Sequence, residues 1–471
     1  MTASGSVLGE RAIVMGAGMA GLLAARTLSD FFEQVTVVER DRLPGHPLQR
    51  KGIPQGRHLH GILSRGSQIL EELFPGILAE ITAGGGHVLD DGNLARVCTR
   101  VGRSGLNRSQ SFADPRALVL HLASRPLVEF AVRSRVIALG NIDFVDNSDV
   151  VGLIAAQSGS VSGVRVADRF SGATADLTAD FVVDAMGRGT RTPALLAALG
   201  YQNPVEQRSS AKATYSSQLI QMESDAFPER LLMIVQPGPG NLRCGLMAQE
   251  RGTWMLTVGR LADDPAPPRD LAAMITQVAQ FMPPAILAGL RRATPLGKAS
   301  TFRYAGAVWR RYDSMVRPPL GLVVVGDALC SLNPIYGQGS TMAGLNALAL
   351  RAYLLTGSTA TPNDFYRMVA ADIGPIWEMN ETNDLAQSGR SPVSIATNWL
   401  ASMALSAAEN DIALTEAFYR VTNLVDPPSR LRDPRLIARM VWGSLVRGPS
   451  SVIGAVRKVG VHSVRDLRCK R

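Results

Sequence analysis

The sequence predicts a mixed α/β fold, with a parallel-sheet domain interleaved with an antiparallel β-sheet domain and followed by helices. Residues 12–28 give the first observation: a short apolar strand runs into a glycine-rich turn and an Ala/Leu-rich helix. Long strand patterns between residues 212 and 260 give the second, and a helical pattern from residue 362 onward gives the third. A chain of 471 residues is long enough for about two or three domains.

The first glycine turn carries Gly16, Gly18 and Gly21 directly after the first strand. Gly16 permits the sharp turn, Gly18 lets the backbone approach a pyrophosphate, and Gly21 lets the helix pack on the strand. The free N–H groups of the helix then face the phosphates. The next strand, 35–38, ends at Glu39, which is placed to accept ribose hydroxyls. This order of strand, glycines, helix, strand and acid predicts a Rossmann-like dinucleotide site.

Residues 40–56 are dense in Pro and Gly, which predicts a long loop leading into a helix over 59–73. Three cations near this loop are available to hold phosphate or a ring carbonyl: Arg50, Lys51 and Arg57. His58 and His60 suggest a metal, but two histidines at this spacing face opposite sides of a helix and have no third ligand nearby. We therefore expect no metal site.

The next segment begins with Asp114 followed by Pro115, which predicts an N-cap and a helix over 114–133. The strand patterns that follow are short and alternating, as in an antiparallel meander. They cover residues 142–145, 150–156, 162–167 and 175–177.

The chain then shows two further segments of the parallel-sheet type. A buried strand at 181–183 ends in Asp184 and Gly187, at the edge where α/β sheets bind ligands. A later strand delivers Asp327, and residues 335–355 form a second glycine turn that opens an Ala/Leu helix. The bare N–H groups of that helix suit an anionic or carbonyl-rich group.

The second domain is predicted from four long strands at 212–222, 231–236, 244–248 and 253–258. Methionines recur on these strands, which favours either a wall that adapts to an apolar ligand or an ordinary core. These methionines are Met222, Met233, Met247 and Met255.

The net charge of +9 is concentrated at the C-terminus. Residues 430–471 hold 11 Lys/Arg and 2 Asp/Glu, which leaves 38 of each sign (49 less 11, and 40 less 2) in the rest of the chain. A neutral body argues against a nucleic-acid partner. Apolar residues lie at helical spacing within the basic segment, from Leu436 to Val446. We favour a helix docked on its own protein over peripheral contact with an anionic membrane or an acidic partner.

The cysteines have no metal-ligand or redox spacing, which favours free thiols in a reducing cytosol. They are Cys98, Cys244, Cys330 and Cys469. The N-terminus shows no signal-peptide pattern, and no window approaches 18 uninterrupted apolar residues. We therefore expect a soluble, cytoplasmic protein.

Three motifs occur together: the turn at 16–21, the segment 184–191, and Gly326-Asp327 followed by residues 334–339. Their combination resembles the group A flavoprotein monooxygenases, the single-component FAD-dependent aromatic hydroxylases, over about residues 8–360. The resemblance implies a Rossmann-like FAD-binding domain interleaved with an antiparallel β-sheet substrate domain, followed by a helical region. The implied segments are 1–195 (FAD), 196–315 (substrate), 316–360 (FAD, return) and 361–471 (helical, with the basic tail).

By this resemblance the first three glycines cradle the FAD pyrophosphate, and Glu39 binds the adenosine ribose. Arg50 matches the loop arginine beside the flavin, Arg116 the helix arginine that reaches the cofactor, and Asp327 the contact to the ribityl and phosphate region. The implied cofactor-binding residues are Gly16, Gly18, Met19, Ala20, Gly21, Glu39, Arg40, Arg50, Lys51, Gly52, Arg116, Asp184, Gly187, Gly326, Asp327, Pro334, Gly337, Gln338, Gly339 and Ser340. Pro334 and Gly337–Gly339 line the flavin ring. No side chain is assigned as catalytic, because the flavin performs the oxygen transfer.

The sequence departs from the common family pattern in two places. Asp327 is followed by Ala-Leu-Cys in place of Ala-Ala-His, and Asn346-Ala347 stands in place of Asp-Ala. Together with the loop 51–60, these departures are similar to the bacterial squalene-epoxidase-like branch, which includes the polyene epoxidases of polyether antibiotic pathways such as monensin and lasalocid. A Trp-x-Trp-x-Ile-Pro halogenase motif is absent from the sequence.

The resemblance implies an oxidoreductase in which a flavin C4a-hydroperoxide epoxidises carbon–carbon double bonds of a large apolar polyene, polyketide or terpenoid in antibiotic biosynthesis. Dioxygen is the co-substrate, electrons come from NAD(P)H or a separate flavin reductase, and the substrate is free or tethered to a carrier protein. Three alternatives stay open: an aromatic hydroxylase, a flavin-dependent reductase of isoprenoid double bonds, and a non-catalytic flavoprotein or apolar-ligand carrier.

Overall fold

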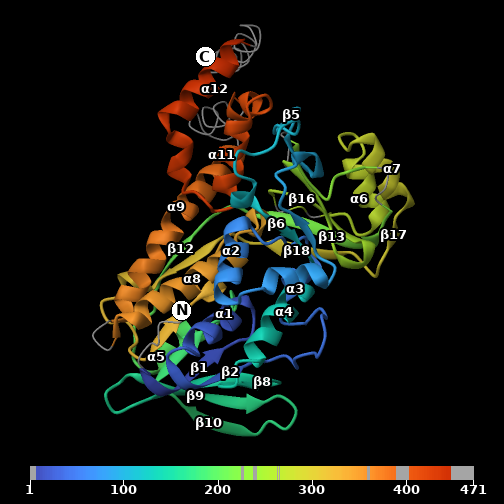
Figure 1. Cartoon of the computed structure of the whole chain (residues 1–471). Helices are drawn as coiled ribbons and strands as arrows, with labels where there is room; N and C mark the ends of the chain where they lie inside the picture. The colour runs from blue at the N-terminus through green and yellow to red at the C-terminus, as the bar shows by residue number, and fades with distance from the viewer. Residues whose placement is uncertain are drawn as a thin grey trace, which may run out of the picture.

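The computed structural model describes residues 7–446, apart from 224–226, 237–240, 263, 265, 358–360 and 389–402. Within these residues the fold is mixed α/β, as the sequence predicts (Figure 1). The part of the predicted basic segment beyond residue 446, including Cys469, lies outside the described residues, as does the break predicted near residues 389–392.

The first domain is built on a five-stranded sheet in the order β20-β11-β1-β2-β7, and all its strand pairs are parallel. Its strands are β1 (Gly9–Met15), β2 (Phe32–Val38), β7 (Ile142–Val145), β11 (Phe181–Asp184) and β20 (Leu322–Val324). Met15 pairs with Asp184 and with Val38, and Asp184 pairs with Val324. The carboxyl ends of these strands therefore meet at one edge, so the register brings the predicted motifs together.

Helix α1 (Met19–Leu28) follows the first glycine turn and packs against α4 (Arg125–Ile137) and α8 (Gly339–Leu355). Its Ala/Leu sequence has apolar residues on every side, because α1 is buried along nearly its whole length. A Cβ atom at Gly21 would overlap the carbonyl oxygen of Gly16, so only glycine permits this approach of helix to turn. Gly16 itself has a φ of +103°, which glycine adopts without strain.

The predicted meander is confirmed for three of its four strands, which form an antiparallel sheet at one end of the molecule (Figure 1). They are β8 (Ser148–Ala155), β9 (Val161–Asp168) and β10 (Thr174–Thr178). The fourth, β7, has the predicted bounds but pairs in parallel with β2. Its assignment to the meander was wrong, because strand periodicity does not specify the partner strand.

The helix predicted over 114–133 was wrong in its first half. Asp114 caps only a single 3₁₀ turn, η3 (Pro115–Leu118), and strand β6 (Leu120–Leu122) follows. Helix α4 starts after Ser124, whose hydroxyl accepts a hydrogen bond from the Leu127 N–H at 3.2 Å. The chain therefore holds two N-cap and proline signals, and the second starts the long helix.

The second domain contains an eight-stranded sheet in the order β17-β13-β16-β15-β14-β4-β5, with β18 paired to β13. Its strands are β4 (Val97–Val101), β5 (Ser104–Gly105), β13 (Ala213–Gln221), β14 (Leu231–Gln236), β15 (Leu242–Ala248), β16 (Thr253–Arg260), β17 (Thr294–Pro295) and β18 (Ser300–Tyr304). Residues 97–105 thus belong to this sheet, although the sequence placed them in the first domain. Helices α6 (Leu271–Val278) and α7 (Pro284–Arg292) bury one face of the sheet.

Alternation along β14 divides its side chains between two environments. Leu232 and Ile234 join the apolar core under α6 and α7. Leu231, Met233 and Val235 line a cavity on the opposite face, which Ile234 also touches. The second domain therefore provides one wall of that cavity.

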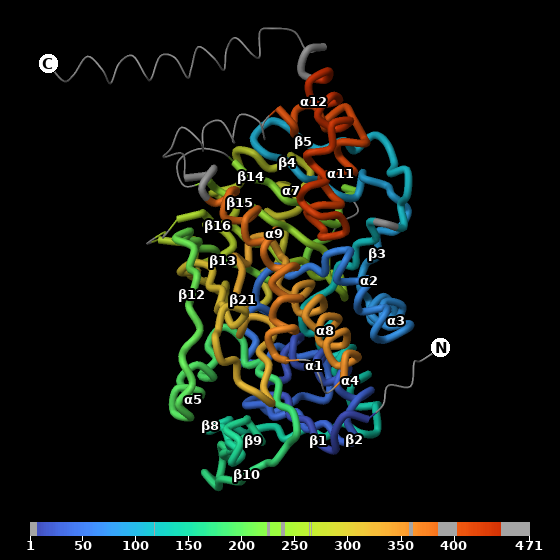
Figure 2. The backbone as a smooth tube through the Cα atoms, turned by 90° about the vertical axis from the view of Figure 1, so that its left-hand side faces the viewer, coloured from blue at the N-terminus to red at the C-terminus, as the bar shows by residue number. Residues whose placement is uncertain are grey.

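The remaining elements connect and cover these sheets. They are α2 (Ser64–Leu73), α3 (Ile77–Ala83), β3 (His87–Leu89), α5 (Thr192–Ala198), β12 (Val205–Arg208), β19 (Val308–Arg311), β21 (Cys330–Ser331), α9 (Pro362–Ser388), α11 (Ile412–Thr422) and α12 (Pro434–Val446). Helices α11 and α12 lie beside β5, at the opposite end of the molecule from β8–β10 (Figure 2). Among the described helices, none is long and apolar enough to cross a bilayer.

Candidate active site

One cavity of about 1380 Å³ extends from the first glycine turn to the C-terminal helices. It is lined by the ends of the parallel strands, by the loop before α2, by the sheet of the second domain and by α11. The predicted cofactor residues on its wall are Gly16, Gly18, Met19, Ala20, Glu39, Arg40, Gly52, Gly187, Gly326, Asp327, Pro334, Gly337, Gly339 and Ser340. The motifs that the sequence places far apart therefore meet around one space.

Two helix N-termini open onto this cavity. Helix α1 begins after Gly18 and α8 begins after Gln338, and neither start has a side-chain cap. The first N–H groups of both helices therefore lack intrahelical partners and can bind an anion or a carbonyl oxygen. The side chain of Gln338 is engaged elsewhere, because its Oε1 accepts a 2.7 Å hydrogen bond from Asn380 on α9.

Glu39 is buried at the end of β2 beside the first turn. Its carboxylate accepts hydrogen bonds from the N–H groups of Ala17 at 2.7 Å and Asp41 at 2.9 Å. These bonds fix the acid beside the turn at the place where the Rossmann pattern needs a ribose acceptor.

Arg50 is buried but does not line the cavity in this structure. Its guanidinium donates to Glu129 at 2.7 Å and to the carbonyl oxygen of Ala17 at 2.8 Å, and Glu39 lies 3.4 Å away. These carboxylates raise the pKa of Arg50 against the opposing effect of burial. Arg50 therefore stabilises the glycine turn through its hydrogen bond to the Ala17 carbonyl oxygen, on the side away from the cavity.

Three other predicted cations also lie off the cavity wall. Lys51 and Arg57 are exposed in the segment before α2, and Arg116 is exposed in the 3₁₀ turn that replaces the expected helix. The arginine that reaches the cavity from a helix is Arg125, at the start of α4. Sequence reasoning missed it because it assigned the helix start to Asp114.

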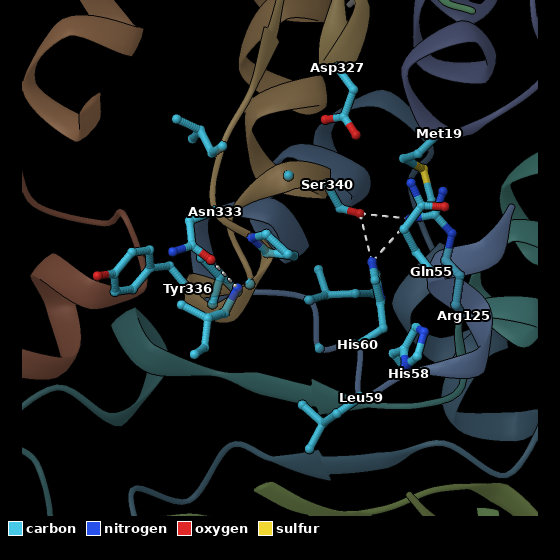
Figure 3. Close-up of a pocket in the computed structure, with 18 of the residues that line it drawn as sticks. Met19, Gln55, His58, Leu59, His60, Arg125, Asp327, Asn333, Tyr336 and Ser340 are labelled. Atoms are coloured by element: carbon cyan, nitrogen blue, oxygen red, sulfur yellow. Dashed lines mark hydrogen bonds between the residues drawn. The ribbon is translucent and has the colours of Figure 1, made fainter. Parts of the chain in front are cut away.

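Arg125, His60 and Ser340 lie together on the cavity wall (Figure 3). Arg125 Nη1 donates to Ser340 Oγ at 2.9 Å and to His60 Nε2 at 3.1 Å, and Nε2 is 3.0 Å from Ser340 Oγ. Because a guanidinium only donates, His60 Nε2 accepts and the proton of the neutral imidazole sits on Nδ1. Among the described residues that Nδ1 has no hydrogen-bond partner.

His58 lies on the second-domain side of the same loop. Its Nδ1 is 2.9 Å from Ser217 Oγ, which is 2.7 Å from Thr257 Oγ1, and its ring packs edge-on against Tyr215. Burial lowers the pKa of His58 to about 4, with a smaller contribution from Arg57. Burial and the charge of Arg125 lower the pKa of His60 to about 3. Both rings are therefore neutral at neutral pH.

These two histidines predict an acid-sensitive stability. In the unfolded chain each histidine titrates near pH 6.5. Below that pH the unfolded state binds a proton that the folded state does not bind, so protonation favours unfolding. The free energy of unfolding should therefore fall as the pH drops from about 6.5 toward 4, by about 1 kcal/mol per pH unit for each histidine. Urea titrations at a fixed flavin concentration between pH 7 and 5 test this.

The His58→Gln variant should lose part of this slope. The matched control is His46→Gln, which changes an exposed histidine in the preceding loop. Equal slopes for wild type, His58→Gln and His46→Gln would contradict the assignment.

Asp184 is buried and shapes the turn after β11. Its carboxylate accepts hydrogen bonds from the N–H of Met186 at 2.8 Å and the hydroxyl of Thr190 at 2.6 Å, and burial raises its pKa. The side chain does not line the cavity, whereas Gly187, with a φ of +75°, does. Asp184 therefore acts on the site through the backbone that it holds.

Asn346, one of the two departures from the family pattern, has a defined place. Its Oδ1 accepts a 2.8 Å hydrogen bond from the N–H of Gly326, directly before Asp327. Asp327 lines the cavity, and burial raises its pKa while Arg125 opposes that rise. An amide in this position orients the Asp327 turn without adding a second negative charge.

The wall that the second domain and α11 give to the cavity is mostly apolar, although Arg100, Arg243 and Arg260 also lie on it. Two of the four singled-out methionines, Met233 on β14 and Met247 on β15, lie on this wall. Met255 pairs with Met247 in the sheet but is buried off the wall, and Met222 packs into the core under α6 and α7. Further apolar lining comes from Leu59, Val101, Leu120, Leu122, Leu231, Val235, Leu405, Phe418 and Tyr419.

The loop that opens α8 is tied to α9. The Tyr336 hydroxyl donates to the Asp384 carboxylate at 2.7 Å, and Asn333 Nδ2 lies 3.3 Å from the same group. Burial raises the pKa of Asp384, and Arg243 on β15 counteracts it. Tyr336 and Asn333 therefore anchor the loop from Pro334 to Gly337 on the cavity wall.

The geometry fits FAD. Two uncapped helix N-termini and a cationic guanidinium face one elongated space, and Gly18 contributes only backbone to its wall. His60 also lines this space, and its buried Nδ1 has no partner among the described residues. Such a set matches an anionic pyrophosphate linked to a carbonyl-bearing ring.

Comparison with known proteins agrees with this fold. The chain is 33% identical to protein Rv3254 of Mycobacterium tuberculosis over 449 residues, covering 93% of this chain and 94% of that protein. It is 27% identical to kynurenine 3-monooxygenase of Salinispora arenicola over 355 residues, covering 71% and 70%. The chain matches no protein-family model.

Solved structures share the architecture at low identity. A flavoprotein/dehydrogenase from Cytophaga hutchinsonii superposes with a TM-score of 0.65 at 15% identity, covering 93% of this chain and 98% of that one. The p-nitrophenol 4-monooxygenase PnpA from Pseudomonas putida gives 0.64 at 14% identity, covering 90% and 99%. The chain therefore belongs to the same family as protein Rv3254 and has the fold of the FAD-dependent monooxygenases.

Proposed function

We propose that the protein is an FAD-dependent monooxygenase that epoxidises carbon–carbon double bonds of a large apolar substrate, such as a polyene, polyketide or terpenoid. The observation that carries this proposal is a continuous cavity that joins two uncapped helix N-termini to a chamber with a mostly apolar lining. The first part suits a dinucleotide, and the second suits a long hydrocarbon.

In this proposal the α1 N-terminus binds the pyrophosphate and Glu39 binds the adenosine ribose. Arg125 adds a positive charge on the cavity wall. The loop from Pro334 to Gly337 lies beside the flavin ring, and the uncapped N–H groups at the start of α8, from Gly339 and Ser340, face it. When bound and reduced, FAD supplies the chemistry that activates dioxygen and transfers one oxygen atom.

The chain's own contribution to the oxygen transfer is orientation and exclusion of water. Met233, Met247, Phe418 and Tyr419 provide apolar and adaptable surfaces that hold an alkene against the ring-binding loop. An alkene needs no protein base to react with an electrophilic oxygen. Among the described residues the acids on the cavity wall are Glu39, Asp149 and Asp327, and none of them lies on a second-domain strand. This lining is compatible with epoxidation.

Aromatic hydroxylation is the second candidate, and two observations favour it. Two relatives carry the name kynurenine 3-monooxygenase, and kynurenine is an aromatic compound. His58 is a neutral imidazole on the wall whose Nε2 has no partner among the described residues, so it can accept a hydrogen bond from a phenol.

The deciding experiment incubates purified protein and FAD with labelled dioxygen and two substrates, a trisubstituted-alkene polyketide mimic and a phenol. NAD(P)H and a flavin reductase serve as alternative electron sources. We expect one labelled oxygen per alkene product, converted to a diol by mild acid. Label on the aromatic ring would establish the hydroxylase instead, and reduction of the alkene without label would overturn the monooxygenase proposal.

A further inference from the structure

Helix α12 has apolar residues on two opposite sides. Leu436 is buried against the core formed with α11, and a Cβ atom at Gly443 would lie 3.2 Å from Ala407. On the other side Ile437, Val441 and Trp442 are 43%, 48% and 70% exposed. Residues at this spacing, together with exposed Ala438, form one continuous face of a helix. We call Ile437, Ala438, Val441 and Trp442 the outer stripe.

Positive charge flanks the outer stripe. Arg435 precedes it on α12 and Arg432 lies in the turn before the helix, and both are exposed. Neither side chain forms an ion pair with another described residue, whereas Arg439 is paired with Asp411 at 2.9 Å. Residues 430–471 carry 11 Lys/Arg and 2 Asp/Glu, and the rest of the chain is neutral.

The outer stripe is also close to the apolar end of the cavity. Leu436 and Met440 of α12 pack into the same cluster as Leu405 and Phe418, which line that end. In both overall views α12 lies at the extremity of the molecule, beside α11 and β5 (Figure 1 and Figure 2). A surface that binds the outer stripe is thus one layer of side chains from the chamber.

We propose that α12 docks the protein onto an anionic lipid surface, with the outer stripe in the headgroup and acyl boundary and the arginines on lipid phosphates. Three observations select a lipid surface over a protein partner. The stripe is a single helix face with an exposed tryptophan, and the flanking arginines Arg432 and Arg435 outnumber the one flanking acid, Asp433, which is paired with Arg430. The net positive charge is also confined to this end of the chain.

The test is co-sedimentation of the full-length flavin-loaded protein with vesicles of phosphatidylcholine alone or with phosphatidylglycerol added. We expect about tenfold stronger partitioning onto the anionic vesicles, weakened by salt. Ile437→Ser/Trp442→Ser should reduce binding to anionic vesicles by about tenfold or more, and Arg432→Glu/Arg435→Glu should do the same.

Matched controls lie elsewhere on the surface. Phe170→Ser changes a residue that is 95% exposed in the β9–β10 turn, and Arg317→Glu changes an exposed arginine before β20. Both should partition like wild type. Flavin content and thermal midpoint equal to wild type show that a variant is folded.

Other outcomes overturn the proposal. Equal binding to both vesicle types overturns the anionic lipid surface as the occupant, and variants that bind vesicles like the controls remove the outer stripe from the lipid contact. A dimer that dissociates in Ile437→Ser/Trp442→Ser, measured by light scattering without vesicles, assigns the stripe to a second copy of the chain. Neither result bears on the labelled-oxygen experiment, so the two proposals fail separately.

Discussion

Replacing Gly21 by alanine is expected to abolish flavin retention by the purified protein. The added Cβ atom overlaps the carbonyl oxygen of Gly16 and lies 3.4 Å from the Cβ atom of Ala185. Relief requires α1 to move away from the turn, which displaces the N–H groups that we assign to the pyrophosphate. Overpacking of this kind lowers the free energy of unfolding by about 1–3 kcal/mol. The displaced N–H groups also weaken flavin binding, because they no longer point at the pyrophosphate. Bound flavin per chain, measured by absorbance after gel filtration, is the readout.

Gly140→Ala is the matched control for this change. A Cβ atom at Gly140 meets nothing within 4 Å, so this variant should keep its flavin. A Gly21→Ala protein that is folded and fully loaded would contradict both the packing argument and the assignment of the phosphate site.

Replacing Arg125 by leucine is expected to weaken FAD binding by about 10- to 100-fold. A hydrogen bond to a charged group contributes about 1.5–3 kcal/mol, and a tenfold change in the dissociation constant corresponds to about 1.4 kcal/mol. Arg125 also orients His60 and Ser340, so its loss leaves these two groups with only their mutual hydrogen bond. Glu129 keeps Arg50 and Arg133 as partners, so no buried carboxylate is left alone.

Flavin fluorescence titration measures the dissociation constant for FAD, and two further variants serve as comparisons. Arg125→Lys keeps the charge and should fall between wild type and Arg125→Leu. Arg135→Gln changes a partly exposed arginine on the same helix, whose partner Glu80 lies at the surface, and should bind FAD like wild type. An unchanged constant for Arg125→Leu would remove Arg125 from the cofactor site.

The local signals in the sequence predict much of the fold. Strands 142–145 and 231–236 have the predicted bounds, and Gly16 and Gly21 have the conformation and packing expected of them. Period-2 and period-3.6 patterns, glycine turns and the terminal acid of a strand are all properties of a few consecutive residues.

Features that depend on distant partners were not predictable in the same way. β7 joins the parallel sheet because β2 presents an open edge there, and β4 joins the second sheet because β14 does. The first N-cap and proline signal yields only one turn, since strand β6 pairs with β3 immediately afterwards. Arg125 and His60 meet through Ser340, 215 and 280 residues away, which no local pattern encodes.

The placement of β4 has a consequence for how the chain is made. Residues 97–101 leave the ribosome long before β14, their neighbour in the sheet, and β20 completes the edge of the first sheet only at residues 322–324. Neither sheet can close until about the last third of the chain is being synthesised, and distant pairings of this kind form slowly. The nascent protein thus carries unpaired strand edges through most of translation, and we expect its yield to depend on chaperones that cover such edges.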